Sequence, residues 1–253
     1  MFKLCFLITA ILFSLDSYAV DANPVMNNSK KIQQKQAEHK DPRFTVGIGA
    51  HSHSFYRGAL LDSASAIAPV GFITFGNIIF AGLAVMYVDQ IPSIGLIYNL
   101  GFNYFTDHGF KRPDNASFRQ LRDETFDAWI SLTKPVNKHL ILTASYHNDV
   151  KENWGKYYTV GAKIPVVQFI SLATELGYGD ERANAYIYGA GSRSGLANLD
   201  VSLNYSAPIL PENGVLGLEI KQTGKVQNEN KTASYVREND ATISIGADVS
   251  WNF

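Results

Sequence analysis

The chain closes with the stretch ATISIGADVSWNF, residues 241–253, in which apolar and polar residues alternate almost without a break. Successive side chains of a β-strand point to opposite faces, so this stretch predicts a strand with one apolar and one polar face. A lipid-facing side and a wet side are the natural assignment. The apolar side carries Ala241, Ile243, Ile245, Ala247, Val249, Trp251 and Phe253.

The same alternation recurs upstream, most clearly in residues 198–206 and more weakly elsewhere. A single-chain bacterial barrel has an even number of strands, so one strand is missing or wrongly divided, most plausibly before Asp107. The pattern predicts an all-β protein, a transmembrane antiparallel up-and-down β-barrel of about twelve strands, with about ten as the alternative. The predicted strands are residues 44–53, 67–75, 78–87, 94–104, 126–133, 139–147, 157–164, 169–178, 198–206, 215–222 and 241–253.

Connector lengths predict the orientation, because outer-membrane barrels have short periplasmic turns and long extracellular loops. The short connectors are residues 134–137, 165–167 and 208–213. The long polar segments are residues 106–124, 179–195 and 224–239. Aromatic residues near predicted strand ends suit the two interfacial girdles. They are Tyr104, Tyr146, Trp154, Tyr178, Tyr205 and Trp251.

The first residues predict an exported protein. Lys3, the apolar residues 4–15 and the small residues around Ala19 are typical of a signal peptide, residues 1–19, cleaved between Ala19 and Val20. Residues 20–42 are expected to be a polar periplasmic leader, mobile or forming a short helix, and residues 43–253 the barrel. Cys5 would leave with the signal, so no disulfide is expected. The chain has 22 basic and 23 acidic residues, which gives no basic excess for nucleic acid.

Charged residues stand in the middle of the polar faces, where the interior of a barrel would be. A narrow interior makes unpaired charges costly, so we expect pairing across the lumen, with a proton or solute path as the functional alternative. These lumen charges are Asp127, Lys163, Glu175, Asp200, Glu219, Lys221 and Asp248.

A soluble β-sandwich would show the same alternation. The mid-strand charges, the aromatic strand ends and the final Phe253 favour the barrel. Val249, Trp251 and Phe253 resemble the C-terminal signal that the outer-membrane assembly machinery recognises. We therefore expect the outer membrane as the location, with its lipid and lipopolysaccharide as surroundings.

Two groups of histidines suggest chemistry. His51 and His53 share one strand face and could bind a metal. His139, Ser145 and His147 could supply a nucleophile and a base, as in outer-membrane lipases and lipid A deacylases, but the sequence specifies no orienting acid. We expect no cofactor, no metal and no enzymatic activity.

The order of segments resembles the MipA/OmpV family, the MltA-interacting outer-membrane proteins. The resemblance runs from an early FTVGIG strand, residues 44–49, through FYRG at residues 55–58, APVGFI at residues 68–73 and FAGLAVMY at residues 80–87. A later loop motif comprises Tyr186, Tyr188, Gly189, Ser194 and Gly195.

This resemblance implies a scaffold at the cell envelope that brings together a lytic murein transglycosylase and a penicillin-binding protein in peptidoglycan synthesis and turnover. Other family members are described as porin-like. The sequence thus favours a non-enzymatic scaffold, with a narrow channel for ions or small solutes as the alternative and a lipid hydrolase as a third hypothesis.

Overall fold

The computed structural model describes residues 42–52, 54–56, 59–62, 66–105, 125–150, 155–189, 192–209, 213–226 and 243–253. The predicted cleavage site at Ala19 and Val20, almost all of the predicted leader, His53 and Trp154 lie outside these residues. No helix within the described ranges is long and apolar enough to cross a membrane.

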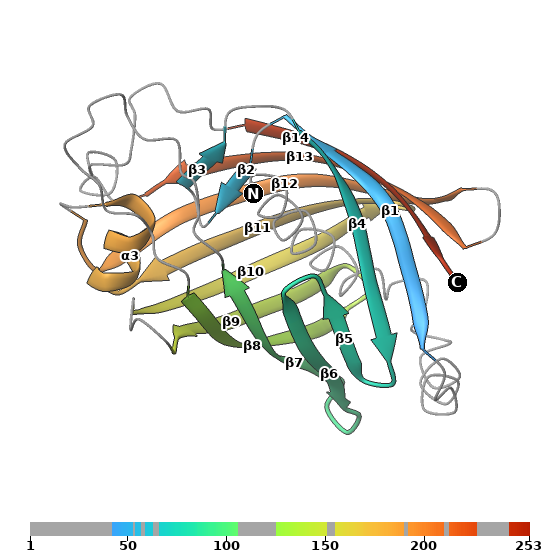
Figure 1. Cartoon of the computed structure of the whole chain (residues 1–253), viewed down its shortest axis with the longest axis horizontal. Helices are drawn as coiled ribbons and strands as arrows, with labels where there is room; N and C mark the ends of the chain where they lie inside the picture. The colour runs from blue at the N-terminus through green and yellow to red at the C-terminus, as the bar shows by residue number, and fades with distance from the viewer. Residues whose placement is uncertain are drawn as a thin grey trace.

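Twelve antiparallel strands form one closed barrel in which each strand pairs with its neighbours in the chain (Figure 1). The predicted twelve-stranded up-and-down barrel is therefore confirmed. A separate hairpin consists of β2 (Ser54–Tyr56) and β3 (Ala59–Asp62). The barrel strands are β1 (Arg43–His51), β4 (Ala66–Phe75), β5 (Ile78–Ala81), β6 (Ala84–Ile91), β7 (Leu96–Phe105), β8 (Thr125–Asn137), β9 (Leu140–Asp149), β10 (Lys156–Val167), β11 (Ile170–Gly179), β12 (Gly195–Ile209), β13 (Gly214–Lys225) and β14 (Ile243–Asn252).

The barrel closes between β1 and β14, in a register that runs from Thr45 opposite Asn252 to His51 opposite Gly246. Phe44 and Phe253 extend this seam, because each donates a backbone hydrogen bond to the other, at 3.2 and 2.8 Å. The final alternating stretch of the sequence is thus the strand that completes the wall.

The missing strand of the sequence prediction lies in residues 78–87. This segment is two strands, β5 and β6, joined by a turn at Gly82 and Leu83. Gly82 has a φ of 60°, a left-handed conformation that glycine adopts without steric cost. Residues 78–87 are apolar on both sides of this tight turn, so the sequence pattern merged the two strands into one run.

Two predicted turns also lie slightly further along the chain than expected. Residues 134–137 belong to the end of β8 and the turn is at residues 138–139, whereas residues 165–167 end β10 and the turn is at residues 168–169. Proline is tolerated at the ends of strands, and the sequence analysis treated it as a turn residue at both places.

One edge of β4 lacks a partner strand over most of its length. Within the described part of the chain, β4 pairs with β1 from Ala66 to Thr74 but with β5 only from Ile73 to Phe75. Figure 1 shows the tip of the β5–β6 hairpin ending well short of the extracellular end of β4. Phe44 and Phe253 form a hydrogen-bonded pair, and such pairs alternate along an antiparallel ladder. Counting from this pair through β1 to β4 shows that the Pro69 nitrogen points toward the free edge. Because proline has no N–H, it removes a donor that the edge would otherwise leave unpaired.

The single described helix, α3 (Glu181–Tyr188), lies at the end of the barrel that the connector lengths predict to be extracellular (Figure 1). The Asp180 carboxylate caps it by accepting from the backbone N–H of Ala183 at 2.8 Å, and it also accepts from the N–H of Lys156 at 2.9 Å. Ile187 and Tyr188 are fully buried and cluster with Tyr157 of β10. The helix therefore packs against the inner side of the wall.

Candidate functional site in the lumen wall

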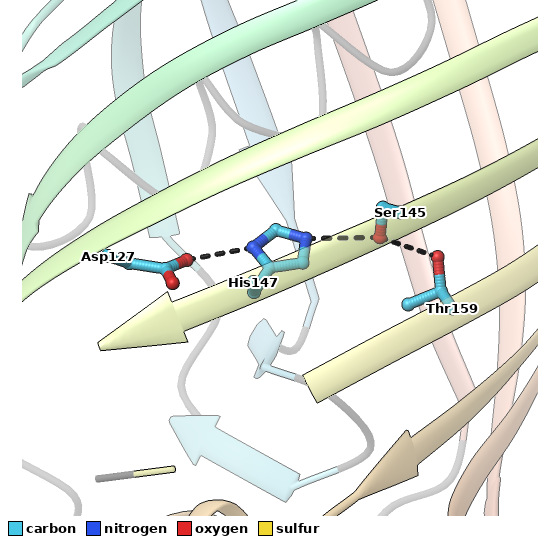
Figure 2. A network of polar contacts seen from close by, with 4 residues as sticks. All are labelled: Asp127, Ser145, His147 and Thr159. Carbon is cyan, nitrogen blue, oxygen red and sulfur yellow. Dashed lines mark hydrogen bonds and ion pairs between the residues drawn. The ribbon is translucent and has the colours of Figure 1, made fainter. Parts of the chain in front are cut away.

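Four polar side chains form a hydrogen-bonded row on the inner wall (Figure 2). The His147 imidazole contacts Asp127 through Nδ1, 2.8 Å from Oδ2, and Ser145 through Nε2, 3.1 Å from Oγ. Ser145 Oγ lies 2.8 Å from Thr159 Oγ1. The order of groups is carboxylate, imidazole, hydroxyl, hydroxyl.

The strand register explains this row. Ser145 and His147 are two residues apart on β9 and therefore share its inward face. Ser145 stands opposite Thr159 of β10, and Asp127 of β8 is the diagonal neighbour of His147 because it pairs with Asp149. Diagonal neighbours on one face of a sheet are close enough for long side chains to meet.

The arrangement orients the imidazole. A carboxylate at Nδ1 favours the tautomer whose proton is on Nδ1, which leaves Nε2 free to accept a proton from the Ser145 hydroxyl. The side chain of Asp127 is only 7% exposed and that of His147 is 21% exposed, so bulk water weakens their contact little. In chemical terms, the row can polarise a serine hydroxyl.

Aromatic rings flank His147 on both sides. Trp129 of β8 is stacked with it at a centroid distance of 6.1 Å, and Tyr157 of β10 meets it edge-on at 6.4 Å. Trp129 lies against Gly101 of β7, where an added Cβ would come within 2.4 Å of the indole ring. Gly101 thus leaves room for the indole against the wall.

A second polar cluster continues from Tyr157 along the wall. The Tyr157 hydroxyl donates to the Asn198 side-chain oxygen, and the Asn198 amide donates to Asp200 Oδ1 at 2.9 Å. Lys221 Nζ lies 2.6 Å from Asp200 Oδ2. The Lys221 charge also interacts with Glu219 and Glu175. A single ammonium group therefore sits among three carboxylates.

All seven charged residues singled out from the sequence lie at inward-facing positions of their strands. The alternation of exposed apolar and less exposed polar residues in β8 and β10–β14 shows this placement. The ion pair of Lys221 with Asp200 runs along the wall between adjacent strands, not across the lumen as expected. The seven residues are Asp127, Lys163, Glu175, Asp200, Glu219, Lys221 and Asp248.

The histidine hypotheses are only partly matched by the structure. His139 lies in the β8–β9 turn, eight residues from His147, and at about 3.3 Å per residue the two are about 26 Å apart. Grouping them in one site was wrong, because β9 extends fully between them. The acid beside His147 is Asp127, which the sequence analysis treated only as a lumen charge.

His51 faces the lumen against Gly246. His53, its suggested partner in a metal site, falls outside the described residues. Within the described ranges, no group of three or more histidine, cysteine, aspartate or glutamate side chains could hold a metal ion.

The loop motif singled out from the sequence lies at the end of the barrel that carries α3. Tyr186 and Tyr188 belong to α3, Gly189 ends this helix with a φ of 95°, and Ser194 and Gly195 lead into β12. The sequence analysis placed these residues in a loop. The helix forms because Asp180 caps its first turn and its tyrosines are buried.

The outer surface of the barrel is apolar at every strand. Ile48, Ile73, Val160, Leu203 and Ile245 are between 41% and 61% exposed, and similar residues cover the remaining strands. A closed sheet with a polar interior and this exterior is suited to lipid, because its strands pair around the circumference and satisfy their backbone groups, except along the part of β4 beyond the β5–β6 hairpin. The chain is an outer-membrane β-barrel. The predicted location is thus confirmed.

Aromatic side chains mark both ends of this outer-membrane barrel. Tyr146, Tyr158 and Tyr178 form a row across β9–β11, with ring centroids 5.1 and 6.2 Å apart. Near the other end, Tyr87 and Tyr98 donate hydrogen bonds to Asp89 at 2.8 and 3.2 Å. The residues of the predicted assembly signal, Val249, Trp251 and Phe253, lie at the same end and on the same outward face of β14 and its continuation.

Comparison with known proteins reveals likeness only in structure. The sequence matches no protein-family model, and no curated protein matches it. The KdgM porin is similar at 10% identity and a TM-score of 0.41, over 83% of this chain and 99% of that one. The NanC porin is similar at 12% identity and a TM-score of 0.42, over 83% and 98%. An outer-membrane channel of Pseudomonas putida F1 is similar at 12% identity and a TM-score of 0.43, over 86% and 97%. Similarities this low transfer no function to the outer-membrane barrel described above.

Proposed function

We propose that the barrel is a narrow pore for small polar solutes, above all cations. The observation that carries this proposal is the inward-facing ring of charged and polar side chains. Its seven mid-strand charges comprise five carboxylates and two ammonium groups. A wall with excess negative charge raises the local concentration of cations and repels anions.

The distribution of charge along the inner wall also favours cations over anions. Lys221 is paired with Asp200, so its charge is largely neutralised within the wall. Glu175 stands directly opposite Asp200 in the register, and Glu219 interacts with the same ammonium group. Lys221 thus interacts with three carboxylates in this part of the lumen.

Planar-bilayer recording in a potassium chloride gradient tests the pore. We expect steady conductance with a reversal potential on the cation-selective side. The double substitution Glu175→Gln, Glu219→Gln should move the reversal potential toward zero, whereas the lipid-facing control Leu218→Ala should leave it unchanged. Absence of conductance from a correctly folded barrel, or anion selectivity, would contradict the proposal.

We propose as a second candidate a non-enzymatic scaffold of the MipA/OmpV kind, linked to peptidoglycan synthesis and turnover. The observation that favours it is the resemblance of residues 44–49, 68–73 and 80–87 to segments of that family. The partners would be a murein transglycosylase and a penicillin-binding protein, contacted through the periplasmic turns and the leader of residues 20–42.

A pull-down with the folded full-length barrel from periplasmic extract tests the scaffold. We expect recovery of a murein hydrolase or synthase, and a matched preparation lacking residues 20–42 should recover less if the leader contributes. Recovery of neither enzyme class by the complete chain would count against this role.

For either function, insertion of the barrel into the membrane would depend on recognition of Val249, Trp251 and Phe253 by the assembly machinery.

A further inference from the structure

We propose that Ser145 and His147 form a serine esterase site on the lumen wall, positioned by Asp127 and acting on carboxylic esters with an apolar acyl group. This activity goes beyond the pore and the scaffold and depends on neither. It rests on the row of Figure 2 and on the side chains around it.

The first argument is the geometry of the proton path. His147 Nε2 is 3.1 Å from Ser145 Oγ and His147 Nδ1 is 2.8 Å from Asp127 Oδ2. Both distances are within the reach that a general base needs toward a nucleophile and toward the acid that orients it. The row thus has the order and spacing that serine hydrolases on unrelated folds share.

A second serine on the same wall shows that this contact is specific. Ser131 of β8 stands directly opposite Ser145 and also faces inward. Its hydroxyl accepts from the Asn99 amide at 2.8 Å. Figure 2 shows the hydrogen bond between the His147 imidazole and the Ser145 hydroxyl. Ser131 is therefore a matched internal control.

Unsatisfied polar atoms lie next to the row. Trp129 Nε1, Asn99 Oδ1 and Asn103 Oδ1 are buried without a hydrogen-bond partner among the described residues. Buried polar atoms are normally paired, and one donor and two acceptors left open on adjacent strands are costly. This part of the wall is therefore not optimised for stability alone.

The neighbouring wall indicates the substrate class. An apolar surface lies on the inward side of β5, of the start of β6 and of the last part of β4, where Phe72, Ala81 and Ala84 cluster with Ile79. Met86 belongs to the same surface and stands opposite Gly101, which stands opposite Trp129.

The register thus makes a continuous shelf from Met86 through Gly101 and Trp129 to His147. At about 4.8 Å between strands this shelf is about 14 Å long. An acyl chain lying on it would place its ester carbonyl beside Ser145.

The reaction balances with water as the only co-reactant. Ser145 Oγ bonds to the acyl carbon while its proton moves to His147 Nε2. The ester C–O bond then breaks, and the alcohol leaves with that proton. Water attacks the acyl-serine, gives a proton to His147, and releases the carboxylic acid as Ser145 regains a proton. The Thr159 hydroxyl, 2.8 Å from Ser145 Oγ, is positioned to donate to the oxyanion.

Labelling with a biotinylated fluorophosphonate tests the nucleophile. The folded full-length barrel should be labelled at Ser145, identified by the mass of the modified peptide. Ser145→Ala should abolish labelling, and Ser131→Ala should not change it. Heat-modifiable migration on a gel shows that each variant is folded. A folded wild-type barrel without label, or equal labelling of the Ser145→Ala variant, would overturn the proposal.

Hydrolysis of p-nitrophenyl esters tests the roles of the other groups. Decanoate should be cleaved faster than acetate if the apolar shelf binds the acyl chain. His147→Gln should lower kcat/KM by at least about 100-fold, and Asp127→Asn should lower it while altering the pH profile, which a merely structural role would not do. Equal rates for all variants would place the activity outside this site and reject it.

Discussion

On the scale of single residues, some polar groups of the inner wall belong to hydrogen-bonded rows, and others are stabilised mainly by one ion pair. Lys221 is of the second kind, because Asp200 is its ion-pair partner at 2.6 Å and both side chains are at most 15% exposed. Asp200 is also held by the Asn198 amide. Removal of the ammonium group would take its positive charge away from Asp200 and from the nearby Glu175 and Glu219.

We predict that Lys221→Met lowers the free energy of unfolding by about 3 kcal/mol, since breaking a buried ion pair leaves one charge unpaired. Adding Asp200→Asn should restore part of this loss. Urea unfolding of the barrel in lipid vesicles, followed by tryptophan fluorescence, measures it. Gln222→Met, on the outward face next to Lys221, serves as the control and should change stability by less than about 0.5 kcal/mol. A similar loss in both single variants would disagree with this account.

Residue-level prediction from the sequence singled out Asp127, Ser145 and His147 but neither Thr159 nor the grouping of the four side chains. The spacing of Ser145 and His147 shows that they share a face, because that follows from a period of two. The contact with Asp127 depends on the register between β8 and β9, which is set by the turn at residues 138–139 and is not written in either strand. For the same reason His139 seemed a candidate although it lies at the other end of β9.

On the scale of elements, the sequence pattern located strands well and short connections poorly. Residues 78–87 read as one strand because an apolar run continues through Gly82 and Leu83. The helix α3 was missed because eight residues are too few to show a clear helical period. The available signal was Asp180, a preferred capping residue three positions before Ala183.

We predict that Asp180→Ala destabilises α3 by about 1 kcal/mol through loss of the cap. The bond from Asp180 to the N–H of Lys156 would also be lost, so the helix should detach from the wall more often. Trypsin should then cut faster after Arg182, which mass spectrometry of the released peptide measures in the folded barrel. Asp89→Ala, at the opposite end, should leave this cleavage rate unchanged. Faster cutting in both variants would show a general loosening unrelated to the cap.

On the scale of the whole molecule, two surfaces with opposite chemistry share one wall of single-strand thickness. Val160 on β10 faces outward and is 57% exposed, while Thr143, opposite the adjacent Gly161, faces inward at nearly the same depth. Neighbouring positions thus meet lipid and lumen. This alternation was predictable from sequence because it repeats in most strands, although β5 and the start of β6 are apolar on both faces. The closure of the barrel had to be inferred from parity.

We predict that Val160→Arg lowers the free energy of unfolding by about 2–4 kcal/mol, the cost of a charge near the bilayer midplane. Thr143→Arg should cost much less, since the lumen solvates charge. The fraction of heat-modifiable protein after urea titration in vesicles compares the two variants. Equal losses would mean that Val160 does not face acyl chains.

At the free edge of β4, the neighbouring strands can be lengthened without changing the number of strands in the barrel. Pro69 removes one of the donors of this edge, between those of Ile67 and Gly71, and the short β5–β6 hairpin ends below it. Extending that hairpin by pairs of residues would raise the wall locally and preserve the register of all other strands. The molecule thus carries a built-in site for insertion, suited to graft a peptide epitope at mid-height of the barrel.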